Sequence, residues 1–372
     1  MKIASVVKDF DINYRGRTKK MQVGHKYVLS DPNAQDLKAS FPDKIEYIRP
    51  FDISSYKKYN GETLDNKSIV FWRTGGFGDL LFISSAVKYL KLKYPTCKII
   101  FATSLVFVDV IADNIYIDDL ELLPLDLEVL QKTDFHIMFE GLIEQGKPGK
   151  MFNAYDLVFG HMKLPIEDNS IKKPHVDLSK DRVRDVEEWF KDLGVTDKDI
   201  KIAIQLKSSS PVRNYPLDKM EKLVNILLNL DKRIKIFYLS GPTDKELEKL
   251  LPETERTKYI FRENRDFRFT MAAVSKMDLA ISVDSVLVHL AAALAIPIIG
   301  IYGPFPSKIR MVYYKNAVGI DPRTNCGPCC THGSYPCERC NSNGESLCFH
   351  LIDNERDILP EVKLLLSLSG KI

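Results

Sequence analysis

The segment from residue 281 to residue 304 constrains the fold of this chain more than any other. The apolar run Leu279 to Val283 has the length and composition of a buried strand. Asp284 and Ser285 follow, with side chains that favour a helix start, and a short apolar helix then passes through His289 toward a second apolar run. This order of strand, polar turn, helix and strand predicts a corner of a parallel α/β sheet, where anionic ligands bind at helix N-termini.

A second corner of the same kind lies far upstream. Ser68 to Trp72 is a strand-like run, and residues 73 to 79 form a Gly-rich turn. The apolar residues that follow recur at helical spacing: Leu80, Ile83, Val87 and Leu90. Two such corners, far apart in the sequence, predict two α/β domains that face one cleft.

The pattern along the chain predicts four parts. Residues 1–65 carry short alternating runs separated by breaks such as Asp31-Pro32-Asn33, which indicates a small, mostly β appendage or an extended arm. Residues 66–175 and 176–352 alternate between strand and helix patterns, so each is expected to form a Rossmann-like domain. Residues 353–372 are apolar at helical spacing and predict a final helix.

Charge and hydropathy restrict the partners and the compartment. The 53 basic and 50 acidic residues nearly balance, so no nucleic-acid partner is expected. The first residues lack the apolar core of a signal peptide, and no charge-free run reaches the length of a membrane span. A cytoplasmic protein without a transmembrane segment is therefore expected.

Three motifs between about residue 68 and residue 352 give the chain a family resemblance. They are Gly78-Asp79 after the first strand, Arg213-Asn214-Tyr215-Pro216, and Ser282-Val283-Asp284-Ser285 with the helix that follows it. With these motifs the chain resembles the heptosyltransferase-like glycosyltransferases of family 9. The resemblance implies a GT-B fold, in which two Rossmann-like domains face a cleft. Residues 66–175 would be the acceptor side and residues 176–352 would bind the nucleotide sugar, with the small N-terminal appendage and a Cys-rich C-terminal insert as additions.

The resemblance implies that Asp79 is the catalytic base. Inverting transfer needs a carboxylate that takes the proton of the acceptor hydroxyl as this oxygen attacks the anomeric carbon. Gly76 and Gly78 would let a substrate approach the backbone closely. The alternative is that Asp79 only caps the helix that begins before Leu80.

The leaving nucleoside diphosphate is expected to be stabilised without a divalent metal ion, as the resemblance implies. Ser208 and Ser209 match hydroxyls that contact phosphate, and Arg213 stands where the family more often has lysine. An arginine can hold a diphosphate through two hydrogen bonds. Asp284 and Ser285 would add the N-terminal N–H groups of a helix. An exposed Arg213 without a ligand is the alternative.

Four further positions near the donor remain open. Val286 stands where the family commonly has glycine, and its β-branched side chain could crowd a phosphate. His289 either faces the cleft or forms a hydrogen bond in the core. Asp244 or Glu246 would bind the ribose hydroxyls, or Asp244 would simply cap an exposed helix.

Six of the seven cysteines fall between residues 326 and 348. Two Cys-x-x-Cys pairs can hold one tetrahedral ion, either zinc or iron, in a structural site. The preferred ligands are Cys326, Cys329, Cys337 and Cys340, with Cys330 or Cys348 as substitutes. Related clusters in family members that glycosylate autotransporter proteins imply iron, although their spacing is not a close match. Disulfides are the alternative, which a reducing compartment disfavours.

The prediction is therefore an inverting glycosyltransferase. It would move a sugar, such as a heptose, from a nucleoside-diphosphate donor, with ADP favoured, to a hydroxyl of a glycan, a lipopolysaccharide or a protein. A sugar-nucleotide epimerase or hydrolase is one alternative, which would need further acid and base residues. A non-catalytic GT-B scaffold that binds a partner is the other; Val286 slightly favours it, whereas Asp79, Arg213 and Asp284 count against it.

Overall fold

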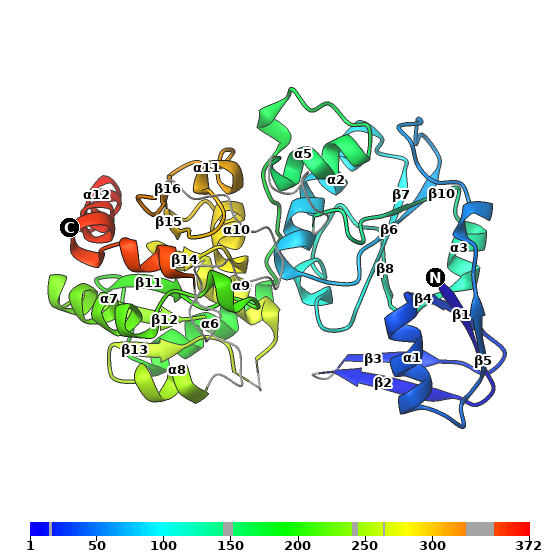
Figure 1. The fold of residues 1–372 in the computed structure, drawn as a ribbon, viewed down its shortest axis with the longest axis horizontal. Coiled ribbons are helices and arrows are strands. Elements are labelled where there is room, and N and C mark those ends of the chain that lie inside the picture. Colours follow the sequence, from blue (N-terminus) through cyan, green and yellow to red (C-terminus); the bar gives the residue numbers. More distant parts are fainter. Residues whose placement is uncertain (15–16, 144–151, 240–244, 263–264, 325–345) are drawn as a thin grey trace. The chain divides into compact units, whose positions relative to one another are not determined.

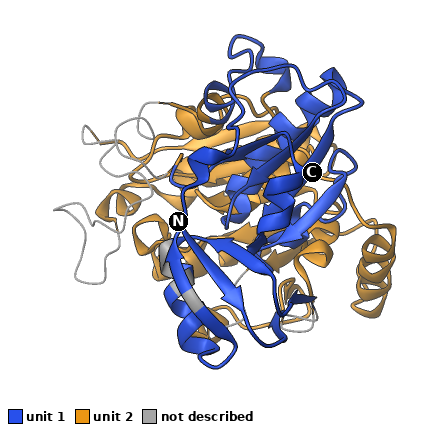
Figure 2. Ribbon diagram, turned by 90° about the vertical axis from the view of Figure 1, so that its right-hand side faces the viewer, with its two compact units in different colours: residues 1–141, 158–171 blue, residues 142–157, 172–372 orange. Residues whose placement is uncertain are grey.

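The computed structural model describes residues 1–14, 17–143, 152–239, 245–262, 265–324 and 346–372. The chain divides into two compact units, coloured separately in Figure 2. Unit 1 comprises residues 1–141 and 158–171, and unit 2 comprises residues 142–157 and 172–372. Each unit contains one parallel sheet, as the α/β prediction requires.

The parallel sheet of unit 1 has the order β10-β6-β7-β8. Its strands are β6 (Ser68–Trp72), β7 (Lys98–Thr103), β8 (Asp119–Leu122) and β10 (Phe135–Met138). The helices beside it are α2 (Phe77–Lys93), α3 (Leu127–Lys132) and α5 (Ala154–His161), the last of which begins in unit 2 (Figure 1). Strand β6 lies inside the sheet and its last four residues are buried, which explains its unbroken apolar sequence.

The N-terminal appendage forms a second sheet in unit 1, with the order β5-β1-β4-β9. Its members are β1 (Lys2–Val6), β4 (Lys26–Leu29), β5 (Ile45–Pro50) and β9 (Leu125–Asp126), and a separate hairpin joins β2 (Phe10–Tyr14) to β3 (Arg17–Met21). Because β9 comes from the Rossmann-like part, this sheet joins the appendage to the rest of unit 1.

Helix α1 (Asp31–Ser40) was not expected. The sequence Asp31-Pro32-Asn33 was interpreted as a break between strands, but Pro32 lies in the first turn of this helix. Proline has the backbone angle that a helix needs there and lacks only an N–H group that would have no partner. Leu37 of α1 packs into a core with Ala4 of β1 and Phe10 of β2.

The sheet of unit 2 is entirely parallel, with the order β13-β12-β11-β14-β15-β16. Its strands are β11 (Ile200–Gln205), β12 (Ile234–Tyr238), β13 (Thr257–Tyr259), β14 (Leu279–Val283), β15 (Ile298–Ile301) and β16 (Ala317–Ile320). Its helices are α6 (Lys180–Asp192), α7 (Leu217–Leu230), α8 (Lys245–Leu250), α9 (Phe267–Val274), α10 (Val286–Ala293), α11 (Ser307–Arg310) and α12 (Leu359–Leu368).

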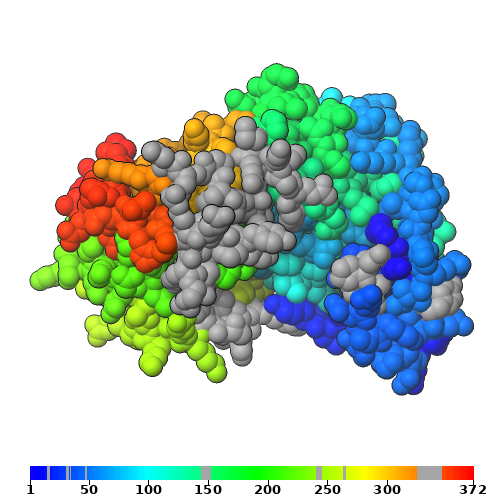
Figure 3. All heavy atoms as spheres, viewed as in Figure 1, coloured from blue at the N-terminus to red at the C-terminus, as the bar shows by residue number. Residues whose placement is uncertain are grey.

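Helices cover both faces of the unit 2 sheet. Ile236 of β12 belongs to the core that α7 and α12 complete. The next residue, Phe237, points to the other face, where it contacts Trp189 and Phe190 of α6. Helix α12, red in Figure 3, forms part of the surface of unit 2 and exposes Leu364 and Leu368. The predicted C-terminal helix is thus present.

Within the described ranges, no helix is long and apolar enough to cross a lipid bilayer.

Candidate active site

The Gly-rich corner of unit 1 joins β6 to α2. Gly76 is the residue before α2 and has a φ of 91°, a left-handed conformation that side chains disfavour. A Cβ atom at Gly76 would collide with the carboxylate of Asp79. Gly76 therefore allows Asp79, in the first turn of α2, to fold back against the turn.

A buried arginine holds this corner together. The Nη2 group of Arg73 donates to the Oδ2 atom of Asp79, and its Nη1 group lies 3.9 Å from the Oε2 atom of Glu140. The same guanidinium donates to the carbonyl oxygens of Gly75 at 2.7 Å and Phe139 at 2.9 Å. Arg73 thus fixes the turn and the two carboxylates with one side chain.

Asp79 has the position and the chemistry of a proton acceptor. It lies in the first turn of α2 and not at the N-cap. In this position its negative charge is stabilised by the positive end of the helix dipole. Its side chain is 16% exposed, so a substrate hydroxyl can reach it. The Arg73 guanidinium favours the charged carboxylate, which is the form that can take a proton.

In unit 2, the loop after β11 carries the serines and the arginine of the second motif. The Ser208 hydroxyl donates to the carbonyl of Ser210 at 2.9 Å, so it shapes the loop. Ser209 is exposed, and its hydroxyl accepts a hydrogen bond of 3.2 Å from the Nη2 group of Arg213. Arg213 ends a short 3-10 helix, Pro211–Arg213.

Asp284 is the centre of a buried charge cluster at the carboxyl end of β14. The Nη1 group of Arg213 donates to the Asp284 carbonyl at 2.8 Å and lies 3.7 Å from its Oδ2 atom. The Nε group of Arg310, at the end of α11, lies 3.4 Å from the same Oδ2 atom. Arg310 also stacks on the Phe305 ring at 4.1 Å. This Arg213–Asp284–Arg310 cluster carries a formal excess of positive charge that an anion could neutralise.

The first turn of α10 lies next to this cluster. Ser285 is the N-cap residue, and its side chain makes no capping hydrogen bond. The backbone N–H of Leu287 donates to the Oε1 atom of Gln205 at 3.1 Å, so one of the N-terminal donors already has a protein partner. Val286 is the first residue of the helix and is half-buried.

The structure places His289 in the core. Its Nδ1 atom lies 2.7 Å from the Tyr314 hydroxyl, which lies 3.1 Å from the Tyr155 hydroxyl. His289 and Tyr155 are buried and Tyr314 is half-buried; burial of the Tyr314 hydroxyl raises its pKa, so this hydroxyl stays protonated. Of the two interpretations of His289, the hydrogen-bonded core residue is the one that this geometry matches.

The proposed ribose-binding residues are only partly described. Glu246 of α8 is exposed, and the Nζ group of Lys207 lies 3.3 Å from its Oε2 atom. Asp244 lies outside the described residues.

The predicted metal ligands Cys326, Cys329, Cys330, Cys337 and Cys340 also lie outside the described residues. Cys348 is half-buried in a 3-10 helix, Leu347–Leu351. The described part of the chain contains no group of three or more side chains suited to a metal ion.

Sequence reasoning missed several residues of these corners. Arg73 was seen only as part of a Gly-rich turn, and Glu140, Gln205, Arg310 and Tyr314 were not considered. An arginine directly after a buried strand is a usable signal for Arg73. The other four follow later strands or end them, and their contacts with Arg73, α10, Asp284 and His289 depend on which strands are neighbours in the sheet.

The sequence of the second domain matches a known family. The model of Glycosyltransferase family 9 (heptosyltransferase) matches residues 164–336, which include the Arg213 and Asp284 motifs. Over this segment the chain is similar to glycosyltransferase family 9. The family and the enzyme class predicted from the three motifs are therefore confirmed. No curated protein sequence matches the chain.

Solved structures share the fold of this chain. A family 9 glycosyl transferase from Veillonella parvula is 18% identical, with a TM-score of 0.64 over 83% of this chain and 99% of its own. The ADP-heptose lps heptosyltransferase II of E. coli is 14% identical, with a TM-score of 0.58 over 82% and 99%. The iron-containing dodecameric glycosyltransferase TibC of enterotoxigenic E. coli is 13% identical, with a TM-score of 0.59 over 95% and 88%. These likenesses confirm the GT-B-like α/β fold.

Proposed function

We propose that this chain transfers a heptose from ADP-heptose to an acceptor hydroxyl, with inversion at the anomeric carbon. The observation that carries the proposal is the buried Arg213–Asp284–Arg310 cluster at the carboxyl ends of neighbouring strands, within the segment that the family model matches. ADP-heptose is favoured as the donor because the structurally similar E. coli protein is named for it.

In this reaction Asp79 acts on the acceptor. Its carboxylate takes the hydroxyl proton as the acceptor oxygen forms a bond to the anomeric carbon. The bond from that carbon to the diphosphate oxygen breaks at the same time, and ADP leaves with the electron pair. A single displacement of this kind inverts the anomeric centre, and Arg73 keeps Asp79 charged and oriented.

The two arginines of unit 2 act on the leaving group. Arg310 supplies positive charge from a buried position and Arg213 from a partly buried one, and a guanidinium pairs well with phosphate oxygens. The Ser209 hydroxyl accepts a hydrogen bond from Arg213 and would donate one to the same diphosphate. We therefore infer that transfer needs no divalent metal ion.

We also propose a structural zinc or iron ion at Cys326, Cys329, Cys337 and Cys340. The support is the sequence spacing and the iron in the structurally similar TibC. Metal analysis of the purified protein, and of a Cys337→Ser variant, tests it. Less metal per chain and a lower melting temperature in the variant would support the site, and unchanged metal content would contradict it.

Calorimetric titration with ADP, UDP, GDP and dTDP tests the donor site directly. We expect ADP to bind most tightly and with the same affinity in magnesium-containing and metal-free buffer. Binding of none of the four would contradict a donor site, and a requirement for magnesium would contradict its metal independence.

Arg213→Ala tests which group holds the diphosphate. Loss of a charge-assisted hydrogen bond is expected to weaken ADP binding about 10- to 100-fold and adenosine binding far less. Arg233→Ala is the control, because Arg233 is a half-exposed arginine of the same unit that pairs with Asp231. Equal losses for ADP and adenosine would remove Arg213 from the phosphate site.

A further inference from the structure

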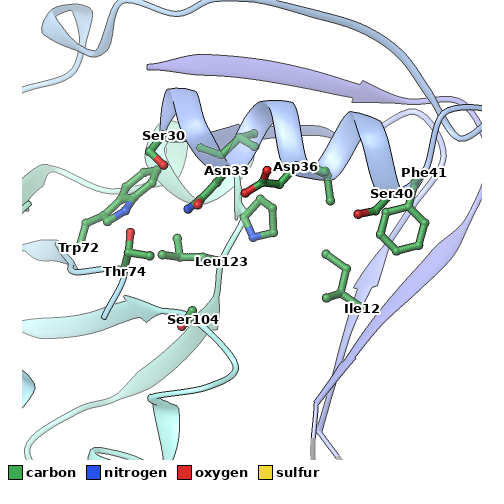
Figure 4. Close-up of a pocket in the computed structure, with 13 residues that line it drawn as sticks. Ile12, Ser30, Asn33, Asp36, Ser40, Phe41, Trp72, Thr74, Ser104 and Leu123 are labelled. Atoms are coloured by element: carbon green, nitrogen blue, oxygen red, sulfur yellow. The ribbon is translucent and has the colours of Figure 1, made fainter. Parts of the chain in front are cut away.

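Unit 1 contains a cavity of about 390 Å³ between the appendage and the parallel sheet. Figure 4 shows α1 along one side of it, with Asn33 and Asp36 directed toward Trp72, Thr74 and Leu123 on the other side. Its volume and its mostly apolar walls are typical of a small-molecule site.

The walls of this cavity are fixed to each other. Strand β4, which leads into α1, pairs with β9 of the Rossmann-like part. The Nε group of Arg17 donates to the Oδ1 atom of Asp109 at 2.7 Å, and His25 contacts Asp126. Because both the strand pairing and these side-chain contacts cross between the two parts, the cavity belongs to the fold of unit 1.

The cavity adjoins the Gly-rich corner. Trp72 ends β6, and Thr74 lies in the turn that carries Arg73 and leads to Asp79. The backbone N–H of Thr74 donates to the Glu140 carboxylate. This contact therefore holds both the wall of the cavity and the Gly-rich corner in place. A molecule in this cavity would therefore contact the strand and the turn that precede Asp79.

The residues that line the cavity are suited to an uncharged ligand that carries hydroxyl groups. Six side chains offer oxygen or amide groups, and each except Asp36 can both donate and accept: Ser30, Asn33, Asp36, Ser40, Thr74 and Ser104. Ile12, Phe41 and Trp72 contribute apolar surface. No lysine, arginine or histidine is among the described residues that line the cavity, and Asp36 makes it acidic.

We propose that this cavity binds an uncharged carbohydrate, which carries the acceptor hydroxyl. This inference rests on the proposed function and names the substrate class of its acceptor side. Sugar hydroxyls donate and accept hydrogen bonds at once, as this lining does, and the ring carbons fit against apolar walls. An acceptor with phosphate or carboxylate groups would meet Asp36 without a cation to compensate.

Fluorescence of Trp72 gives a direct binding assay. The chain has two tryptophans, Trp72 and Trp189, so the variant Trp189→Phe leaves Trp72 as the single reporter and keeps an aromatic ring beside Phe237. The probes are lactose, maltose and cellobiose as neutral sugars, glucuronic acid and glucose 6-phosphate as anions, and a serine- and threonine-containing peptide. We expect a saturable change with at least one neutral disaccharide and none with the anions or the peptide.

Asp36→Lys tests the charge of the ligand in the same protein. We expect it to weaken binding of the neutral sugar roughly tenfold or more, because a hydrogen bond to a carboxylate is lost. Asp43→Lys is the matched control, because Asp43 is exposed just after α1 and does not line the cavity. Tighter binding of the anionic probes to wild type, or an equal effect of the two variants, would overturn the inference.

ADP titration of the same variants separates this inference from the proposed function. Normal ADP binding with no response to any neutral sugar would overturn the carbohydrate assignment and leave the donor site intact. A response to the peptide alone would overturn it in favour of a protein acceptor. Sugar binding without ADP binding would instead contradict the proposed donor.

Discussion

The two strand–turn–helix corners of this chain have the same backbone plan and opposite charge. In unit 1, one arginine, Arg73, contacts two carboxylates, Asp79 and Glu140. In unit 2, two arginines, Arg213 and Arg310, contact one carboxylate, Asp284. Counted over these described side chains, the first set has a formal charge of −1 and is called the acidic corner, and the second has +1 and is called the basic corner.

This difference supports the opposite roles that we propose for the two corners. An excess carboxylate suits a corner that must accept a proton, whereas an excess guanidinium suits one that must hold a leaving diphosphate. The backbone of a parallel α/β corner only brings groups to the carboxyl ends of the strands. The side chains that meet there decide which half of a transfer reaction the corner can serve.

The largest expected effect comes from removing Asp79, the proposed base of the acidic corner. Asp79→Asn keeps the shape of the side chain and should lower transfer by about 10²- to 10⁴-fold. ADP affinity, which we propose depends on unit 2, should stay within about twofold. Asp65→Asn, at an exposed aspartate of unit 1, is the control for assays of transfer and ADP binding. Wild-type turnover of Asp79→Asn would contradict the role of Asp79 as the base, and with it the contrast between the two corners.

Loss of the single arginine of the acidic corner should mainly cost stability. Arg73→Met leaves two carboxylates in a partly buried site, so the free energy of unfolding should fall by about 3–5 kcal/mol. Denaturant unfolding measures this fall. In the double variant Arg73→Met/Asp79→Asn, part of the loss should be recovered, and strictly additive losses would show that the two side chains do not interact.

Loss of one arginine from the basic corner should mainly cost donor binding. Arg310→Met retains the apolar stem against Phe305 and should weaken ADP binding about 10- to 100-fold by calorimetry. Lys308→Met, an exposed cation on the same helix, should leave it nearly unchanged. Equal effects would mean that general charge and not the cluster attracts the diphosphate.

Removal of the Tyr314 hydroxyl should have a smaller effect. Tyr314→Phe removes the partner of His289 and Tyr155, so the free energy of unfolding should fall by about 1 kcal/mol. ADP affinity should not change if His289 serves the core. A clear loss of ADP affinity at unchanged stability would return His289 to the donor site.

The smallest effect concerns the stability of unit 1 in mild acid. Burial lowers the pKa of His136, a 5% exposed residue of β10. Below the ordinary histidine pKa of about 6.5, the unfolded chain binds a proton that the native chain does not, so stability falls as pH is lowered. His136→Leu should reduce the fall in melting temperature between about pH 7.5 and about pH 5.5. An identical fall in both proteins would exclude His136 as a cause.

Much of the fold could be predicted because buried parallel strands have unbroken apolar sequences. Ser68–Trp72 and Leu279–Val283 were expected as strands, and both are buried members of their sheets. Helix α1 could not be predicted in this way, because Asp-Pro-Asn favours a turn and a helix start equally. The appendage packs its Leu37 against β1 and β2, and that packing selects the helix.

The candidate site shows the same division. The sequence by itself determined the two corners and named Asp79, Arg213 and Asp284, because strand, turn and helix signals lie within a few residues of each other. Only the tertiary structure brought Glu140 to Arg73 and Arg310 to Asp284, across sequence separations that no local pattern covers. The order of strands in each sheet decides which carboxyl ends are neighbours, and so it decides the charge of each corner.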